Sequence, residues 1–165
     1  MLEAIRREQS LLVLTARLVA PVSSTRQTLV AGLVVDTDRQ ASIVPATVSY
    51  RLDLAALGPE DLAWDPGARL LTVRRPPLSI GQPTIHWDEA ETFSREGWLP
   101  LNDSIALRLQ QDNLAKAPAL FQAQARAPAL LAQAREAADA ALAATLRLPL
   151  AAAGFPDARV VVEGG

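Results

Sequence analysis

The sequence predicts an α+β fold: a mainly antiparallel, twisted sheet in the N-terminal half, Ala/Leu-rich helices in the C-terminal half, and a final short strand. Residues 9–92 alternate apolar and polar side chains and are rich in Val, Ile and Thr, with Pro, Gly and Asp between the runs. Residues 102–153 are rich in Ala and Leu at helical spacing, and residues 158–163 form a last apolar run. Strands followed by helices indicate an α+β domain, and 165 residues suit a single domain spanning 1–165.

The strand-rich half begins with three long alternating segments. They predict strands at Ser10–Ala20, Thr25–Val35 and Ala41–Leu52, separated by turns at Pro21–Ser24 and Asp36–Gln40. Such alternation is typical of an antiparallel sheet with one solvated face. We expect a sheet of roughly five or six strands.

Shorter elements follow as far as residue 98. Asp53 is expected to cap a helical turn at Leu54–Leu57, because its carboxylate can accept from exposed amides. A second turn is predicted at Pro59–Leu62, and Pro76-Pro77 favours extended backbone. The remaining predictions are strands at Leu70–Arg74, Leu78–Ile80 and Thr84–Trp87, then a loop at Glu91–Trp98 anchored by Phe93 and Trp98.

The helical half contains three prolines. Asn102 or Asp103 is expected to cap its start, and Pro149 and Gly154 to end it. A proline inside a helix costs on the order of 3 kcal/mol, so we expect a break or kink near Pro118, near Pro128 or at both. One stripe in the last helix has core spacing: Leu131, Ala134, Ala138, Leu142 and Thr145.

The last strand, at 158–163, is too apolar for a free tail and should return to the sheet. The core is expected to draw on apolar residues from both halves of the chain. They are Leu12, Leu14, Leu33, Val35, Val48, Leu52, Leu71, Val73, Ile85, Ile105, Leu131, Leu142 and Val161.

Composition excludes several function classes. The chain has no cysteine, which removes disulfides, thiolate metal sites and cysteine nucleophiles. Its net charge is −2 with scattered Lys and Arg, so no basic face for nucleic acid is expected. No run approaches the roughly 20 apolar residues of a membrane span, so residues 1–165 are not expected to insert into a membrane. An anchor upstream remains an alternative, and the compartment is left open.

The only histidine, His86, lies beside Trp87, Asp88, Glu89 and Glu91. A general base or a metal ligand is one interpretation. Metal sites usually need three or four protein ligands and no second histidine exists, so a surface strand histidine is favoured. The three acidic residues are read as solvated rather than as a catalytic pair.

Other candidates are weaker. Asp36, Thr37 and Asp38 resemble a hard-cation loop but lack EF-hand spacing, so a solvated hairpin tip is preferred. Arg74 and Arg75 could hold a phosphate or carboxylate, but strand residues next to each other point to opposite faces, so they are not expected to form one patch. Three serines also lack a catalytic setting: Ser23, Ser24 and Ser104. We therefore assign no catalytic, cofactor-binding or metal-binding residue.

The order of motifs resembles a bacterial family, domain of unknown function 4230. The motifs are an Asp-Leu-x-x-Leu step at Asp53–Leu57, a strand entering a Pro-Pro corner at Val73–Ile80, an acidic and aromatic loop at Trp87–Trp98, an Ala/Leu-rich helix and a terminal strand. The resemblance covers about Ser10 to Val162. It implies a frequent N-terminal membrane anchor but no known activity, cofactor or catalytic residue. Pro118 and Pro128 depart from the family's usually charged, proline-poor helix.

Three functions remain open. The first is a non-catalytic interaction or assembly module, associated with the bacterial envelope through an upstream anchor, which meets a second copy or another protein through its helical half. The second is a small-ligand or lipid-binding module with a pocket between sheet and helix. The third, and weakest, is a hydrolase that uses His86 and nearby acids.

Overall fold

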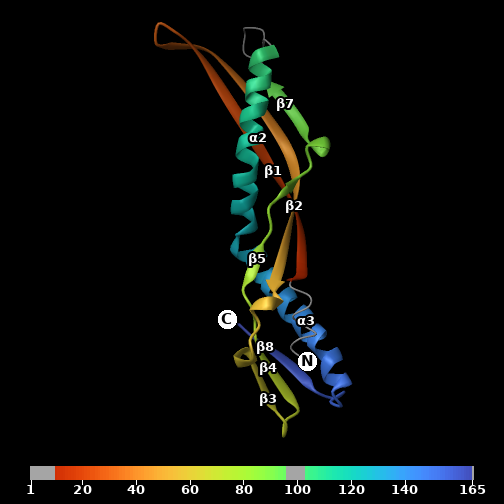
Figure 1. Cartoon of the computed structure of the whole chain (residues 1–165). Coiled ribbons are helices and arrows are strands. Elements are labelled where there is room, and N and C mark those ends of the chain that lie inside the picture. Colours follow the sequence, from red (N-terminus) through yellow and green to blue (C-terminus); the bar gives the residue numbers. More distant parts are fainter. Residues whose placement is uncertain (1–9, 96–102, 165) are drawn as a thin grey trace. The chain divides into compact units, whose positions relative to one another are not determined.

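The computed structural model of the chain describes residues 10–95 and 103–164. Within these ranges, the side chains of residues 26, 28–30, 35–36, 38–39, 94–95 and 103–110 lie outside the description. The described residues confirm the predicted α+β class, with strands first, two long helices after them and a short strand at the end (Figure 1).

Two 21-residue strands, β1 (Ser10–Val30) and β2 (Leu33–Asp53), form a long hairpin. The turn between them is Ala31-Gly32, with φ angles of +51° and +82°. Positive φ at both central residues is the signature of the tight hairpin turns whose twist matches the strands. The predicted turns at Pro21–Ser24 and Asp36–Gln40 are therefore wrong, because both segments lie inside strands.

Ala31 is in a conformation that favours glycine, so Ala31→Gly is expected to raise the free energy of unfolding by about 0.5 kcal/mol. Left-handed backbone costs an L-residue about 1–2 kcal/mol, and glycine removes this cost. Glycine also gives the unfolded chain more conformational freedom, which offsets part of the stabilisation. Gly32→Ala is the matched control and should lose about 1 kcal/mol, although a Cβ there meets no atom within 4 Å. Urea denaturation of both variants measures the difference, and equal shifts of one sign would contradict it.

The chain then returns along β2 in three short antiparallel strands. They are β5 (Leu78–Ile80), β6 (Thr84–Ile85) and β7 (Glu91–Arg95). The register pairs Tyr50 with Ile80, Ala46 with Ile85 and Ala41 with Phe93. The predicted loop at Glu91–Trp98 is wrong for residues 91–95, where Phe93 is a half-exposed strand residue; Trp98 lies outside the described residues.

A second sheet contains β3 (Leu62–Asp65), β4 (Leu70–Arg74) and β8 (Arg159–Glu163), in the order β3-β4-β8. β3 and β4 form a hairpin, and β8 pairs parallel to β4 with Val161 opposite Thr72. The last strand thus returns to a sheet as predicted. A single sheet of five or six strands is wrong, because the described residues form eight strands in two sheets and β3 was missed.

Two short 3-10 helices lie between β2 and β3. They are η1 (Leu54–Ala56) and η2 (Pro59–Asp61), at the two predicted turns. Asp53 caps η1 as expected, since its Oδ1 accepts from the amide of Ala55 at 3.0 Å.

The helices are α2 (Asp103–Ala125) and α3 (Pro128–Ala152). The predicted break occurs at Pro128: Ala127 is extended (ψ 137°) and Pro128 is the first residue of α3, where the missing amide costs nothing. Pro118 lies inside α2. Pro149 also lies inside α3, so the prediction that it ends the helix is wrong. The helix ends at Ala152, and the predicted Gly154 lies just beyond its cap residue, Ala153, with a φ of +93° that suits glycine.

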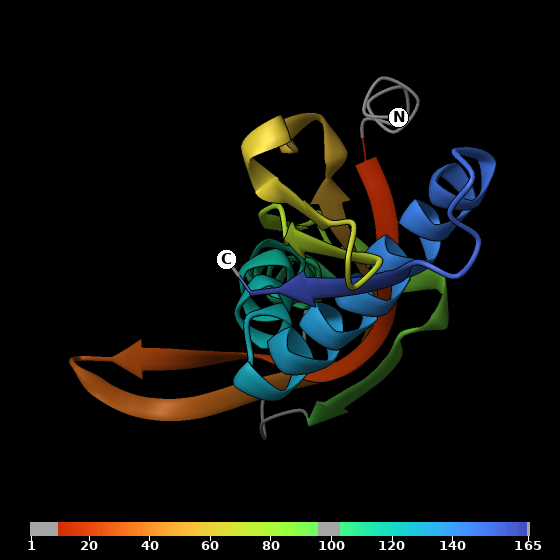
Figure 2. The same cartoon turned by 90° about the horizontal axis from the view of Figure 1, so that it is seen from below.

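The described residues form two compact units, and β1 and β2 contribute to both. Unit 1 comprises 10–15, 49–81 and 127–164; unit 2 comprises 16–48, 82–95 and 103–126. Within unit 1, β8 lies against α3 and beside β4 (Figure 2). The buried core of unit 1 is Leu52, Leu54, Leu57, Leu71, Val73, Ala138, Leu142, Leu146 and Leu150. That of unit 2 is Ala20, Val22, Val44, Ala46, Ala117 and Phe121.

The predicted core is partly right. Five of its residues are buried: Val48, Leu52, Leu71, Val73 and Leu142. Ile85 packs against the core of unit 2, and Leu14 and Leu131 are half-buried. Leu12, Leu33 and Val161 are wrong, with exposures of 50%, 72% and 47%. Val35 and Ile105 lie outside the described side chains.

Strand phase accounts for Leu12 and Val161, whereas Leu33 directly follows the hairpin turn, where its neighbour Val34 is exposed as well. Leu11 and Val13 pack on the core of unit 1, so Leu12 points to the other face of β1. Farther along the same strand, the buried residues are the even-numbered Ala20 and Val22. The buried positions of β1 therefore change from odd-numbered to even-numbered residues along the strand. A strict alternation with a period of two does not predict this change.

Candidate functional site

The candidate site lies in unit 1, where the chain leaves β4 and turns toward β5. The amide of Arg75 donates to the carbonyl of Glu163 at 2.9 Å, which ties this corner to β8. Pro76 is buried and Pro77 is exposed. Because each proline forces the residue before it into extended backbone, the corner leads directly into β5.

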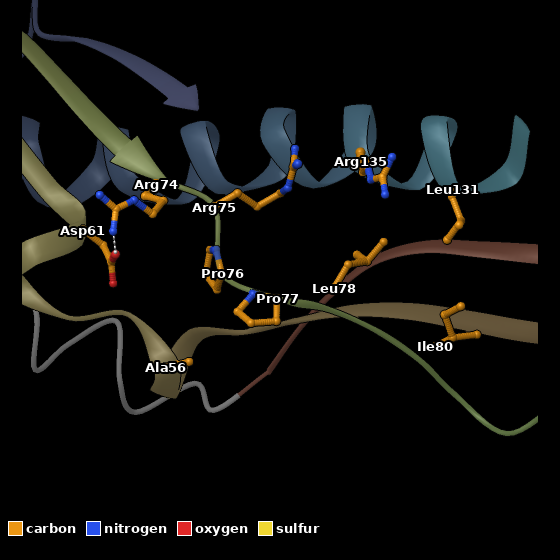
Figure 3. Close-up of a pocket in the computed structure, with 10 residues that line it drawn as sticks. All are labelled: Ala56, Asp61, Arg74, Arg75, Pro76, Pro77, Leu78, Ile80, Leu131 and Arg135. Atoms are coloured by element: carbon orange, nitrogen blue, oxygen red, sulfur yellow. Dashed lines mark hydrogen bonds and ion pairs between the residues drawn. The ribbon is translucent and has the colours of Figure 1, made fainter. Parts of the chain in front are cut away.

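Beside this corner is a cavity of about 510 Å³ (Figure 3). Apolar side chains from β5 and α3 form much of its wall, among them Leu78, Ile80 and Leu131. Its polar groups are Asp61, Arg74, Arg75 and Arg135. A cavity of 300–1,000 Å³ with apolar walls and few charged groups is typical of small-molecule sites.

The three arginines of the cavity differ in their pairing. The Arg75 side chain is 12% exposed, and its Nη1 donates to both carboxylate oxygens of Asp139, at 2.7 and 2.9 Å. Arg74 is mostly exposed and meets Asp61 at 3.3 Å. Arg135 has no hydrogen-bond or ion-pair partner among the residues that the structure describes. Asp61 and Asp139 thus balance the charges of Arg74 and Arg75. Among the described residues, the positive charge of Arg135 is not balanced.

The prediction that Arg74 and Arg75 do not form one patch is wrong. Arg74 is the last residue of β4 and Arg75 lies just beyond it, and both line the cavity although their side chains reach different carboxylates, Asp61 and Asp139. Sequence reasoning missed Arg135, although it lies four residues after Leu131 and therefore on the same side of the helix.

The family model described as protein of unknown function (DUF4230) matches residues 3–160 of the chain. The chain belongs to this family. The match includes the whole candidate cavity of the DUF4230 chain, and it ends at the second residue of β8. No curated protein and no solved structure shows significant similarity to it.

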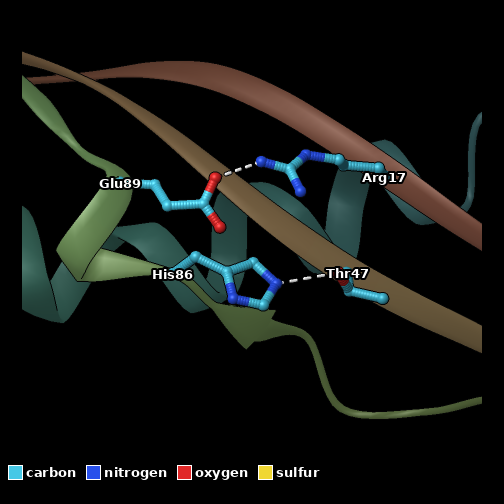
Figure 4. Close-up of polar contacts among 4 residues, drawn as sticks. All are labelled: Arg17, Thr47, His86 and Glu89. Carbon is cyan, nitrogen blue, oxygen red and sulfur yellow. Dashed lines mark hydrogen bonds and ion pairs between the residues drawn. The ribbon is translucent and has the colours of Figure 1, made fainter.

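His86 of the DUF4230 chain lies in unit 2, immediately after β6 (Figure 4). Its Nε2 is 2.8 Å from the hydroxyl of Thr47, and Glu89 pairs with Arg17. Trp87–Glu89 form a 3-10 turn, η3, whose N-terminal cap residue is His86. Among the described side chains, no group of three His, Asp or Glu residues is placed to hold a metal ion.

The remaining predicted candidates are dispersed. Asp88, Glu89 and Glu91 are exposed. Ser23 is exposed, whereas Ser24 is buried and donates to Asn113 Oδ1 at 2.7 Å. Asp36, Thr37 and Asp38 belong to β2 rather than to the predicted hairpin tip. The side chains of Asp36, Asp38 and Ser104 lie outside the description.

Unit 2 has a small cavity of its own, of about 110 Å³. Asn113 lines it together with Ser42, Trp87 and Thr92. Asn113 is 2% exposed, and its Nδ2 has no hydrogen-bond partner among the described residues. A buried amide donor in a polar cavity of this size is a place for ordered water.

None of the described helices of the DUF4230 chain is long and apolar enough to cross a membrane.

Burial raises the pKa of Tyr50, the only tyrosine, above its ordinary value of 10.0. The unfolded chain therefore ionises first as the pH rises. The stability that this group contributes is complete below about pH 10 and is lost as the pH climbs through the folded-state pKa. Ultraviolet titration of the phenolate should give a midpoint above that of the denatured chain. Identical midpoints would contradict the burial of Tyr50.

Proposed function

We propose that this DUF4230 member is a non-catalytic binding module that takes a small anionic ligand with an apolar part into the cavity beside Arg135. The observation that carries the proposal is Arg135, which has no partner among the described residues and lies at the wall of a largely apolar cavity. Charge-assisted hydrogen bonds from guanidinium to carboxylate or phosphate are among the strongest that proteins make. An anion is therefore the group best matched to Arg135.

The pairing of the other two arginines supports different roles for them in the cavity. Asp139 holds Arg75 in place, so this side chain is a fixed part of the wall. Arg74, which has one long contact to Asp61, is free to turn toward an anion near Arg135. Leu78, Ile80 and Leu131 offer apolar surface to the rest of the ligand. A short amphiphile with a single anionic group fits both requirements.

Binding of decanoate, followed by calorimetry, tests this proposal. Arg135→Gln should weaken binding about tenfold or more, because one charge-assisted hydrogen bond contributes about 1.5–3 kcal/mol. Arg51→Gln is the matched control: Arg51 is exposed in the same unit, does not line the cavity, and should bind as the parent does. His86→Ala, in unit 2, should also leave binding unchanged.

Two results would contradict the proposal. One is an equal loss in the Arg135 and Arg51 variants, which would indicate non-specific attraction of the anion. The other is binding of decanol as tight as that of decanoate, which would leave the guanidinium without a role.

Assembly through the helical half is a second candidate, favoured by Leu148 of α3, which is 78% exposed. Light scattering over a range of protein concentrations measures it. Association with the bacterial envelope through an upstream anchor stays a prediction.

A further inference from the structure

The outer edge of β8 carries unpaired backbone groups. The amide of Arg159 donates to Arg69 and the carbonyl of Glu163 accepts from Arg75, both at 2.9 Å, so residues 159, 161 and 163 direct their backbone groups toward β4. Successive strand residues direct these groups to opposite sides. Val160 and Val162 therefore present their N–H and C=O groups to the other side, where no described strand pairs with β8. Such an edge is a template for a further strand.

The side chains of β8 divide between its two faces. Val160 and Val162 pack on the core of unit 1, whereas Arg159, Val161 and Glu163 are exposed on the opposite face. Neither Arg159 nor Glu163 has a side-chain ion pair among the described residues. The exposed series is thus a cation, an apolar residue and an anion at alternate positions.

This series is complementary to itself when it is reversed. If a second β8 runs antiparallel with Val161 opposite Val161, Arg159 of each strand lies opposite Glu163 of the other. The same register places Val160 opposite Val162, and these are the residues whose backbone groups point outward. They would form the hydrogen-bonded pairs of the ladder, and the charged residues would lie at the closer, non-hydrogen-bonded pairs.

We propose that two copies of the chain associate through antiparallel pairing of their β8 strands. The pairing would join two β3-β4-β8 sheets into one sheet across a twofold axis at Val161. This inference is independent of the ligand proposed above, because the residues of β8 do not line that cavity.

A groove along β8 supports a strand-sized occupant. It has a volume of about 560 Å³ and is lined by Arg147 and Leu148 of α3 together with Val160 and Val161. Leu148 is the most exposed large apolar residue among the described residues of unit 1. A second copy placed on β8 would cover apolar surface at the groove in addition to making ladder hydrogen bonds. The contact is small, so we expect a weak, concentration-dependent dimer.

Charge reversal tests this register. In Arg159→Glu, glutamates would face each other at both ends of the paired strands; in Glu163→Arg, arginines would. Each variant alone should dimerise about tenfold more weakly than the parent, because two cross-strand pairs change from attraction to repulsion. An equimolar mixture of the two variants should regain the association of the parent, since each strand then meets its complement. Sedimentation velocity over a wide concentration range measures all three.

Arg51→Glu is the matched control for Arg159→Glu, because it makes the same change of net charge at an exposed site outside β8, and it should associate as the parent does. Val162→Pro removes one outward amide and should also weaken the dimer. A parent chain that remains monomeric at every concentration overturns the proposal. So does a dimer that all β8 variants retain, or a mixture that associates no better than its components. Circular dichroism of each variant confirms that the fold persists.

Discussion

Phe121→Ala is expected to lower the free energy of unfolding by about 3–5 kcal/mol, the usual cost of removing a buried aromatic ring. Phe121 is 0% exposed and belongs to the core of unit 2, with Val22, Val44 and Ala46. That core is otherwise built from small side chains, so little else can fill the space. Guanidinium denaturation followed by circular dichroism measures the loss.

Leu120→Ala is the matched control for this change. Leu120 precedes Phe121 on α2 but is only half-buried at the border of the same core. We expect it to lose less than half as much stability. Equal losses would contradict the burial pattern of α2. The same curves test the predicted single domain, since one shared transition by several probes is expected when β1 and β2 contribute to both units.

Asp139→Ala should cost about 2–3 kcal/mol by leaving the guanidinium of Arg75 unpaired. Arg75 is 12% exposed, and removing one partner of a buried ion pair costs about 3–5 kcal/mol; Asp139 itself is 36% exposed, which reduces the expected loss. The thermal midpoint and the denaturation curve measure it. The variant should also bind decanoate differently, because a wall of the cavity is no longer fixed.

Asp157→Ala serves as the control for this prediction. Asp157 pairs with Arg69 at 3.5 Å, and the two side chains are 78% and 63% exposed. Exposed pairs contribute about 0–1 kcal/mol, so the loss should be small. A double variant, Arg75→Leu with Asp139→Leu, should recover part of the stability lost in Asp139→Ala. If Asp139→Ala and Asp157→Ala are equally stable, the Arg75 pair is not a buried one.

Local sequence signals predicted several caps and element boundaries correctly. Asp53 caps its turn, β4 occupies the predicted residues Leu70–Arg74, and helix α3 begins at Pro128. In each case a single residue type acts on its immediate neighbours, through a carboxylate, strand alternation or the ring of proline. Such effects can be read without knowledge of distant contacts.

The long hairpin was predicted less well. Turn-forming residues at Pro21–Ser24 and Asp36–Gln40 suggested two breaks, yet both segments continue as strand, and the chain reverses at Ala31-Gly32. The Ala-Gly pair is a weaker signal than Asn-Gly, because alanine tolerates positive φ poorly. Pairing along the hairpin outweighs local preference there, and single-sequence reasoning does not see that pairing.

The cavity shows the same limit. Arg74 and Arg75 were noticed, but their shared cavity depends on the end of β4 and on Arg135 and Asp139, which lie more than 50 residues later. No spacing within one segment connects these residues. A pocket between sheet and helix was one of the predicted alternatives, but Arg135, which has no partner among the described residues, was not predicted.

The parallel pairing of β4 with β8 has a consequence for biosynthesis. Residues 70–74 leave the ribosome long before residues 159–163, so on a nascent chain β4 has only β3 as a neighbour. Contacts between segments so far apart in sequence form slowly because a long loop must close first. Until β8 has been translated, the inner face of α3 lacks Val160 and Val162 to cover it. We therefore expect unit 1 to be the part most open to chaperones and proteases during synthesis.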